Sequence, residues 1–130
     1  MKIIMYHYVR DLKLTKYKNL KALKLDDFKK QILFLKKNYK FYNPISYDKK
    51  MNFNNHCWLT FDDGYLDHFK FVLPILEENN IKGSFFITNN IQKQTILEVN
   101  KIQFLLECKK SKYLLNEIKI LHNNLLKLKK

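Results

Sequence analysis

Short apolar runs alternate with stretches of helical periodicity along this chain, and this alternation is the feature that most restricts its fold. Four apolar runs predict strands, at 2–9, 41–45, 56–61 and 82–87. Four stretches predict helices, at 25–38, 67–80, 95–108 and 111–130. Strands that alternate with helices pair in parallel and are covered by those helices, so the chain is expected to adopt an α/β fold.

Local patterns refine these elements. The run 2–9 is apolar at almost every position, which predicts a strand buried on both faces. Asp26 or Asp27 is expected to cap the first helix, whose apolar residues recur at helical spacing as Phe28, Ile32 and Leu35. Pro74 lacks an amide proton, so it must lie in the first turns of the helix 67–80 or kink it.

The charge of the chain is strongly positive. Its 130 residues suit one domain, and 25 basic against 12 acidic residues give a net charge of +13. Such an excess can indicate a polyanionic partner. However, Arg10 is the only arginine, and abundant lysine, asparagine and isoleucine are typical of proteins encoded by AT-rich DNA. We therefore predict no nucleic-acid partner and keep a small nucleic-acid-binding module as the third hypothesis.

The cysteines and the hydropathy exclude several classes of protein. Cys57 and Cys108 lie far apart, which argues against a disulfide framework and a cysteine zinc site, and Cys57 is expected to be buried. The sequence contains no window of about 18 uncharged apolar residues, so no transmembrane segment is predicted. The N-terminal apolar stretch is too short and polar for a signal peptide, so a cytoplasmic location is predicted.

The segment most indicative of chemistry is Asp62-Asp63-Gly64, directly after the strand 56–61. Active sites of parallel sheets collect at the carboxyl ends of the strands. Of two adjacent carboxylates, one can act as a base while the other binds a cation. An ordinary strand-to-helix turn, with an aspartate as helix cap, is the alternative.

Nearby side chains are further candidates. His7 ends the first predicted strand and is expected to line the same mouth as the two aspartates. His68 follows one turn later, either as a substitute ligand or as a solvated or helix-packing histidine. Asp67 is expected to cap the helix rather than to act in catalysis.

The segment Thr60-Phe61-Asp62-Asp63-Gly64 resembles the first signature of the polysaccharide deacetylases, carbohydrate esterases with a distorted (β/α) barrel. Other blocks agree in order over about residues 2–90: Met5-Tyr6-His7-Tyr8-Val9, Val72-Leu73-Pro74-Ile75-Leu76 and Lys82-Gly83-Ser84-Phe85-Phe86-Ile87. The resemblance implies hydrolysis of the C–N amide bond of an N-acetylated saccharide or sugar precursor. It also implies that Asp62 is the general base and that Asp63 binds a divalent metal, with zinc favoured.

The sequence departs from the family pattern after the strand 82–87. Similar sequences with the same N-terminal motif carry His-Lys-Ile-His where this chain has Asn100-Lys101-Ile102-Gln103. Amides bind zinc less well than imidazoles do. The later arginine, aspartate and histidine signatures have no counterpart, and a closed barrel of this type needs about 200 residues or more. We therefore expect an incomplete metal site and a truncated, partial barrel.

The chain is expected to divide into a deacetylase-like β/α region, 1–90, and a helical segment packed on it, 91–130. An apolar stripe in the last helix is expected to cover the sheet or to dock on a protein partner; its members are Leu114, Ile118, Leu121, Leu125 and Leu128. The first hypothesis for function is a metal-dependent deacetylase-like hydrolase. The alternative is a catalytically inactive, truncated relative that binds carbohydrate or a partner protein.

Overall fold

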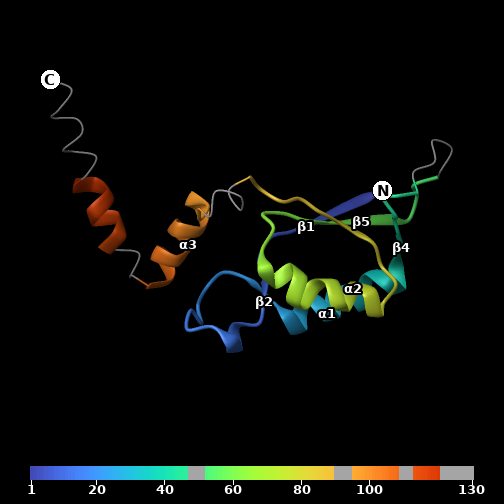
Figure 1. Ribbon diagram of the computed structural model, residues 1–130, viewed down its shortest axis with the longest axis horizontal. Coiled ribbons are helices and arrows are strands. Elements are labelled where there is room, and N and C mark those ends of the chain that lie inside the picture. The colour runs from blue at the N-terminus through green and yellow to red at the C-terminus, as the bar shows by residue number, and fades with distance from the viewer. Residues whose placement is uncertain (47–51, 90–94, 109–112, 121–130) are drawn as a thin grey trace, which may run out of the picture.

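The computed structural model describes residues 1–46, 52–89, 95–108 and 113–120 (Figure 1). The elements follow in the order β1 (Lys2–Tyr6), β2 (Val9–Arg10), the 3₁₀ helix η1 (Leu12–Leu14), β3 (Leu23–Lys24), α1 (Leu25–Asn38), β4 (Lys40–Phe41), β5 (His56–Phe61), the π-helical segment η2 (His68–Val72), α2 (Leu73–Glu78), β6 (Gly83–Phe85) and α3 (Glu98–Cys108). Residues 113–120 are also helical.

β5 is the central strand of the main sheet, and its partners run parallel to it. β1 pairs along one edge, from Lys2 opposite Cys57 to Tyr6 opposite Phe61. β4 pairs with the beginning of β5 and β6 with its end, so these two strands share the other edge. β2 and β3 form a separate parallel pair. The predicted α/β architecture with parallel strands is confirmed, whereas a partial barrel stays a prediction.

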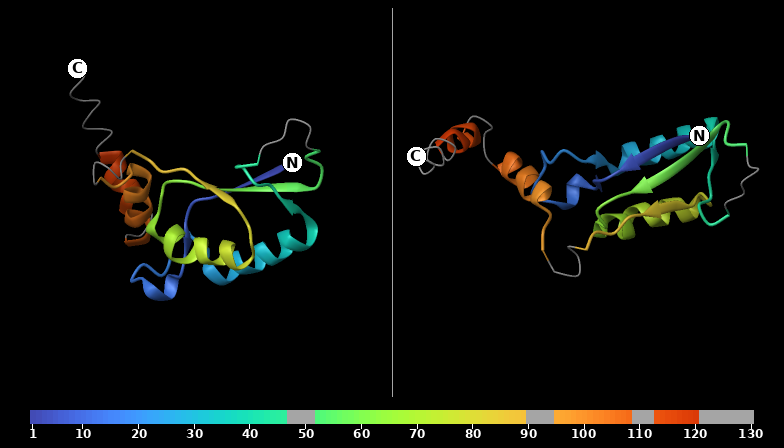
Figure 2. Two further views of the ribbon diagram at one scale, coloured as in Figure 1. Left: turned by 45° about the vertical axis from the view of Figure 1, so that its right-hand side comes forward. Right: turned by 90° about the horizontal axis from the view of Figure 1, so that it is seen from above.

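Two helices cover one face of the main sheet. α1 and α2 lie side by side beneath β1 and β5, as Figure 1 and both panels of Figure 2 show. Phe28, Ile32 and Leu35 of α1 are buried, as their spacing predicts. Phe28 packs edge-on against Tyr6 and Phe61, and the rings of Tyr6 and Phe61 stack with centroids 5.2 Å apart. Each fully buried ring of this size stabilises the fold by about 2–3 kcal/mol.

The other face of β1 is open. Ile3 and Met5 are each 59% exposed, while Tyr6, on the helix side, is buried. The prediction that the strand 2–9 is buried on both faces is therefore wrong. The physical reason is that both covering helices, α1 and α2, pack on the same side of the sheet.

The helix after β5 contains a π-helical segment. In η2, the Leu73 amide donates to the His68 carbonyl, five residues earlier, and Pro74 follows in the first turn of α2. A proline clashes with the carbonyl four residues before it in a regular α-helix, and a wider π turn accommodates that clash. Pro74 thus lies in the first turn of α2 and directly follows a distorted turn, so both alternatives predicted for it are observed.

Two local expectations differ from the structure. The residue that precedes α1 is Lys24, which makes no side-chain capping bond, while Asp26 and Asp27 lie within the first turn. The aspartates therefore interact with the positive end of the helix without capping it. The short strand predicted at 41–45 is observed as β4, Lys40–Phe41.

α3 packs on the segment between β2 and β3. The Tyr17 and Phe104 rings meet edge-on at 4.7 Å, and the Asn19 amide donates to a Glu107 carboxylate oxygen at 3.1 Å. Residues 113–120 lie away from β1 and β5 in Figures 1 and 2, and Ile118 of the predicted stripe is exposed. Leu121, Leu125 and Leu128 lie outside the described residues. The division at residue 90 stays a prediction.

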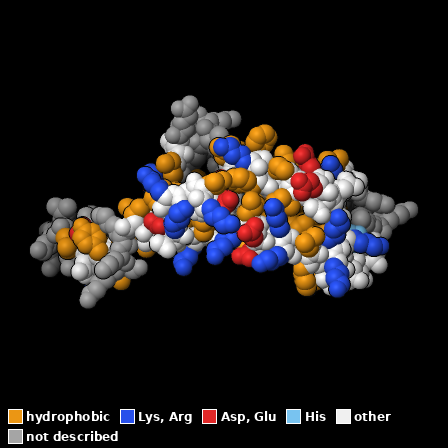
Figure 3. Space-filling model, turned by 90° about the horizontal axis from the view of Figure 1, so that it is seen from below, with side chains coloured by type: hydrophobic (Ala, Val, Ile, Leu, Met, Phe, Trp, Pro, Cys, Tyr) orange, Lys and Arg blue, Asp and Glu red, His pale blue; other side chains and the backbone are white. Residues whose placement is uncertain are grey.

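The face formed by α1 and α2 carries lysines scattered among hydrophobic and acidic side chains (Figure 3). In the described part of the chain, no helix is both long enough and apolar enough to cross a membrane.

Candidate active site

The predicted carboxylates emerge where β5 ends. The Asp62 amide donates to the Tyr6 carbonyl at 2.9 Å, which extends the pairing with β1 by one step. Asp63 and Gly64 then adopt φ angles of 73° and 65°. Glycine takes this left-handed conformation freely, and aspartate tolerates it better than most residues do. The two residues reverse the chain and leave the Asp63 side chain beside the end of β1.

Two side chains bond the same oxygen of Asp63. His7 donates from Nδ1 to Asp63 Oδ2 at 3.0 Å, and the Tyr65 hydroxyl lies 2.9 Å from that oxygen. The Asp63 side chain is 19% exposed, whereas that of His7 is 49% exposed. The carboxylate is therefore held from two sides, while the imidazole still reaches solvent.

Tyr65 is a neutral hydrogen-bonding group at this site. Burial raises its pKa, and so do its hydrogen bonds to Tyr8 and Asp63. Its ring stacks on Tyr8, with centroids 4.2 Å apart. The hydroxyl thus keeps its proton and is fixed in place by the stacked ring.

The first turn of α3 joins the same hydrogen-bond chain. Asn100, which is 8% exposed, places Oδ1 2.8 Å from the Tyr65 hydroxyl. The Tyr65 hydroxyl has one proton and donates it to Asp63, so it cannot also donate to Asn100. If the Asn100 amide is turned by about 180°, Nδ2 donates to the hydroxyl oxygen and both contacts are satisfied. Gln103, one turn later, has a buried Oε1 that no described residue bonds. Residues three apart share a helix face, so both amides belong to the face of α3 that carries the Tyr65 contact.

His68 is a buried positioning residue. It is 3% exposed, and its Nε2 donates to the His7 carbonyl at 2.5 Å. Its Nδ1 is buried without a partner among the described residues. Burial lowers the pKa of His68, so the ring is neutral at pH 7. Nε2 is thus engaged by the His7 carbonyl, and the ring anchors the backbone of His7.

Asp67 also differs from its expected role. It makes no capping bond, and its carboxylate pairs with the Arg10 guanidinium. That guanidinium also lies over the Tyr8 ring, 5.0 Å from its centroid. With the bond between His68 and His7, this ion pair ties the chain after β1 to the helix after β5.

An apolar cavity of about 240 Å³ lies beside the turn. Its lining comes from the turn, the following helix and the end of β6: Gly64, Tyr65, His68, Phe69, Leu73, Phe85 and Ile87. Neither Asp62 nor Asp63 lines it. The cavity is therefore a neighbour of the carboxylate pair and does not enclose it.

Comparisons with known proteins decide the family. The family model described as polysaccharide deacetylase matches residues 49–117, just over half of the chain. The chain belongs to the polysaccharide deacetylase family. The resemblance recognised from the sequence motifs is thus confirmed. No match was found among curated proteins.

Two solved structures share the fold. Streptococcus pyogenes deacetylase PplD, solved in complex with acetate, matches with 22% identity and a TM-score of 0.56, over 82% of this chain and 51% of its own. IcaB from Ammonifex degensii matches with 23% identity and a TM-score of 0.53, over 66% of this chain and 37% of its own. This chain therefore spans about half of PplD and just over a third of IcaB.

The family resemblance implies a divalent metal, but the donor set in the described part of this chain does not fit one. Catalytic zinc sites use three protein ligands. No group of three or more His, Cys, Asp or Glu side chains converges within the described ranges. Asp63 and His7 meet, but they bond each other, and amides stand at 100 and 103. We therefore derive no chemical step through a metal.

Asp62 differs from Asp63 in having no such partners. Its side chain is half-buried, and no described residue forms a hydrogen bond with it. A carboxylate in this state is available to accept a proton from a bound molecule. Tyr65 and Asn100 were not singled out as members of the site from sequence, although the family's histidine position marked residue 100.

Proposed function

We propose that this polysaccharide deacetylase hydrolyses the C–N amide bond of an N-acetylated saccharide or sugar precursor at the carboxyl end of β5. The observation that carries the proposal is the contrast between the two aspartates. Asp63 Oδ2 is bonded by His7 and Tyr65, while the Asp62 carboxylate has no partner in the described part of the chain.

Asp62 acts as the general base in this proposal. Its carboxylate accepts a proton from a water molecule as the water oxygen attacks the carbonyl carbon of the acetyl group. The C–N bond then breaks, and the nitrogen leaves as an amine after taking up a proton. The acetyl group leaves as acetate, so water is the only co-reactant.

His7 is placed to supply the proton that the leaving amine requires. Its Nδ1–H donates to Asp63, as the imidazole of a Ser-His-Asp triad donates to its carboxylate. Nε2 has no partner among the described residues, and the side chain is half exposed. A proton on Nε2 can therefore pass to a nitrogen bound in front of it, while Asp63 stabilises the charged ring.

Binding without turnover is the second candidate. It is favoured by one observation, the presence of Asn100 and Gln103 where the family resemblance places metal-binding histidines. Amides and hydroxyls are suitable partners for sugar hydroxyl groups. In this alternative, the hydrogen-bonded side chains of Tyr65 and Asn100 bind the saccharide, and no acetate is released.

Acetate release separates the two candidates. The full chain is incubated with N-acetylglucosamine oligomers, and acetate is measured beside a binding assay. Asp62→Asn keeps the side-chain shape and removes the base, so release is expected to fall about 10²–10⁴-fold. Asp27→Asn, an exposed carboxylate on α1, is the matched control and retains activity. Oligomer binding by the wild type with no acetate release would favour the second candidate.

A cytoplasmic location and a protein partner for the C-terminal helix stay predictions from the sequence.

A further inference from the structure

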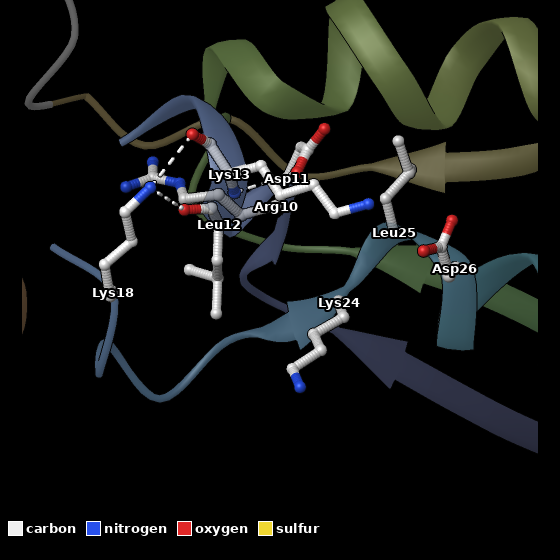
Figure 4. A pocket seen from close by; sticks show the side chains of 8 residues that line it. All are labelled: Arg10, Asp11, Leu12, Lys13, Lys18, Lys24, Leu25 and Asp26. Atoms are coloured by element: carbon white, nitrogen blue, oxygen red, sulfur yellow. Dashed lines mark hydrogen bonds between the residues drawn. The ribbon is translucent and has the colours of Figure 1, made fainter. Parts of the chain in front are cut away.

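A second cavity lies outside the carboxylate site and carries a different chemistry. Its volume is about 300 Å³, at the lower end of the range for small-molecule sites. Two segments line it (Figure 4), and their residues are Arg10, Asp11, Leu12, Lys13, Lys18, Lys24, Leu25 and Asp26. None of the aspartates, histidines, tyrosines or amides of the candidate active site belongs to this lining.

Short connections join this cavity to the active site. β2 and β3 are parallel and end in register, with Arg10 opposite Lys24. β2 begins three residues after β1 ends, and His7 lies between the two strands. Arg10 also pairs with Asp67, four residues after Asp63. The cavity and the carboxylate pair are thus linked by short covalent and ionic connections.

The lining is cationic. It contains four basic and two acidic side chains, and one of the acids is already engaged, because Asp11 Oδ1 accepts the Lys13 amide at 2.9 Å. The Lys18 ammonium donates to the carbonyl oxygens of Leu12 and Lys13, at 3.3 and 3.0 Å, which holds this long side chain at the wall. An ammonium has three protons, so one remains for a ligand.

Arg10 adds a second fixed cation to the wall. Arg10 uses Nε for Asp67 and stacks over Tyr8, so its guanidinium is fixed while its terminal nitrogens have no partner among the described residues. α1 starts at this wall, but Asp26 and Asp27 in its first turn already interact with the positive end of the helix. The positive potential of the cavity therefore comes from two fixed cations, Arg10 and Lys18, and from two further lysines, Lys13 and Lys24.

We propose that this cavity binds a phosphate group carried by the saccharide substrate, as an anionic subsite beside the deacetylation site. The assignment of the phosphate to a saccharide rests on the proposed function, whereas the phosphate site itself does not. Lysine and arginine are the usual partners of phosphate oxygens. The substrate class is accordingly a phosphorylated or phosphodiester-linked N-acetylated sugar.

Calorimetric titration of the full chain at constant ionic strength tests the phosphate site, with inorganic phosphate as the probe. Lys13→Gln/Lys24→Gln removes two cations from the lining and is expected to weaken phosphate binding at least about tenfold. Lys29→Gln/Lys30→Gln makes the same charge change on the exposed surface of α1, and a loss of less than about twofold is expected. Titration without saturation, or equal losses in both variants, overturns the site.

A second arm tests the source of the phosphate. N-acetylglucosamine 6-phosphate is expected to bind about tenfold more tightly than either inorganic phosphate or N-acetylglucosamine. Equal affinities for the sugar phosphate and inorganic phosphate overturn the assignment to a saccharide. Asp62→Asn is expected to leave the phosphate titration unchanged, so a failure of acetate release and a failure of phosphate binding are separate results.

Discussion

The Nδ1 atom of His7 lies 3.0 Å from Oδ2 of Asp63, although 56 positions separate the two residues in the sequence. The contact forms because β1 and β5 are paired in parallel and end together, with Tyr6 opposite Phe61. His68 fixes the other side of this junction by donating to the His7 carbonyl. The geometry of the candidate site is therefore set by strand register and by one buried histidine.

The His7–Asp63 pair predicts a specific effect of His7→Gln. Glutamine keeps an amide that can donate to Asp63 but cannot supply a proton to the leaving amine. Acetate release is expected to fall about 10²–10⁴-fold, and the pH profile of kcat/KM is expected to lose the limb that reports this acid. His56→Gln is the matched control, because that ring bonds only the Asn54 carbonyl among the described residues. An unchanged pH profile in His7→Gln would assign His7 a structural role only.

Tyr65→Phe tests the hydrogen-bond chain from Asp63 to Asn100. The variant keeps the stacked ring but leaves the buried Asn100 amide without its partner. An unsatisfied buried polar group costs about 1–3 kcal/mol, so the free energy of unfolding should fall by that amount in urea denaturation. Tyr17→Phe, which keeps the edge-on contact with Phe104, should stay within about 0.5 kcal/mol of the wild type. Equal free energies of unfolding for Tyr65→Phe and the wild type would contradict the hydrogen bonds that join Asp63, Tyr65 and Asn100.

The sequence predicts the fold wherever periodicity and burial coincide. The bounds 25–38 and 56–61 agree with α1 and β5, and Cys57 is buried as expected. The burial of β1 was mispredicted because an apolar run does not reveal which faces helices cover. The π-helical segment was not predicted either, since it depends on how a helix accommodates Pro74.

The candidate site was predictable only in part. Asp62 and Asp63 stand at the carboxyl end of a buried strand, as their position after the run 56–61 implies. The bond between Tyr65 and Asn100 joins residues 35 positions apart and depends on where α3 packs, which no local pattern encodes. Asp67 was assigned a capping role because sequence shows its place before the helix but not the guanidinium of Arg10.

The burial of His68 predicts a pH dependence of stability. Burial lowers its pKa in the folded state from the ordinary value of 6.5, so below that pH the unfolded chain binds the proton more readily. The stabilisation is complete above pH 6.5 and is lost as the pH falls through the folded-state pKa. The unfolding midpoint in urea should therefore drop between pH 7 and pH 5, and this slope should shrink in His68→Gln. His56→Gln should keep the wild-type slope, and an unchanged slope in His68→Gln would contradict the assignment.

The described residues do not form a donor set that fits a metal ion. Substitutions that supply the missing ligands are therefore expected to create a zinc site. Asn100 already contacts the Tyr65 hydroxyl that touches Asp63, and Gln103 follows one turn later with an unbonded buried oxygen. Asn100→His/Gln103→His would place two imidazoles on that helix face, which with Asp63 makes the three protein ligands of a catalytic zinc site.

Zinc content after dialysis is the measurement. The wild type is expected to retain well under one zinc per chain, and the double variant about one, which adding Asp63→Ala should abolish. Asn100→Gln/Gln103→Asn, which exchanges the amides, is the matched control and should not retain zinc. One tightly bound zinc per wild-type chain would contradict this account, because it would require Asp63 to exchange His7 and Tyr65 for a metal ion.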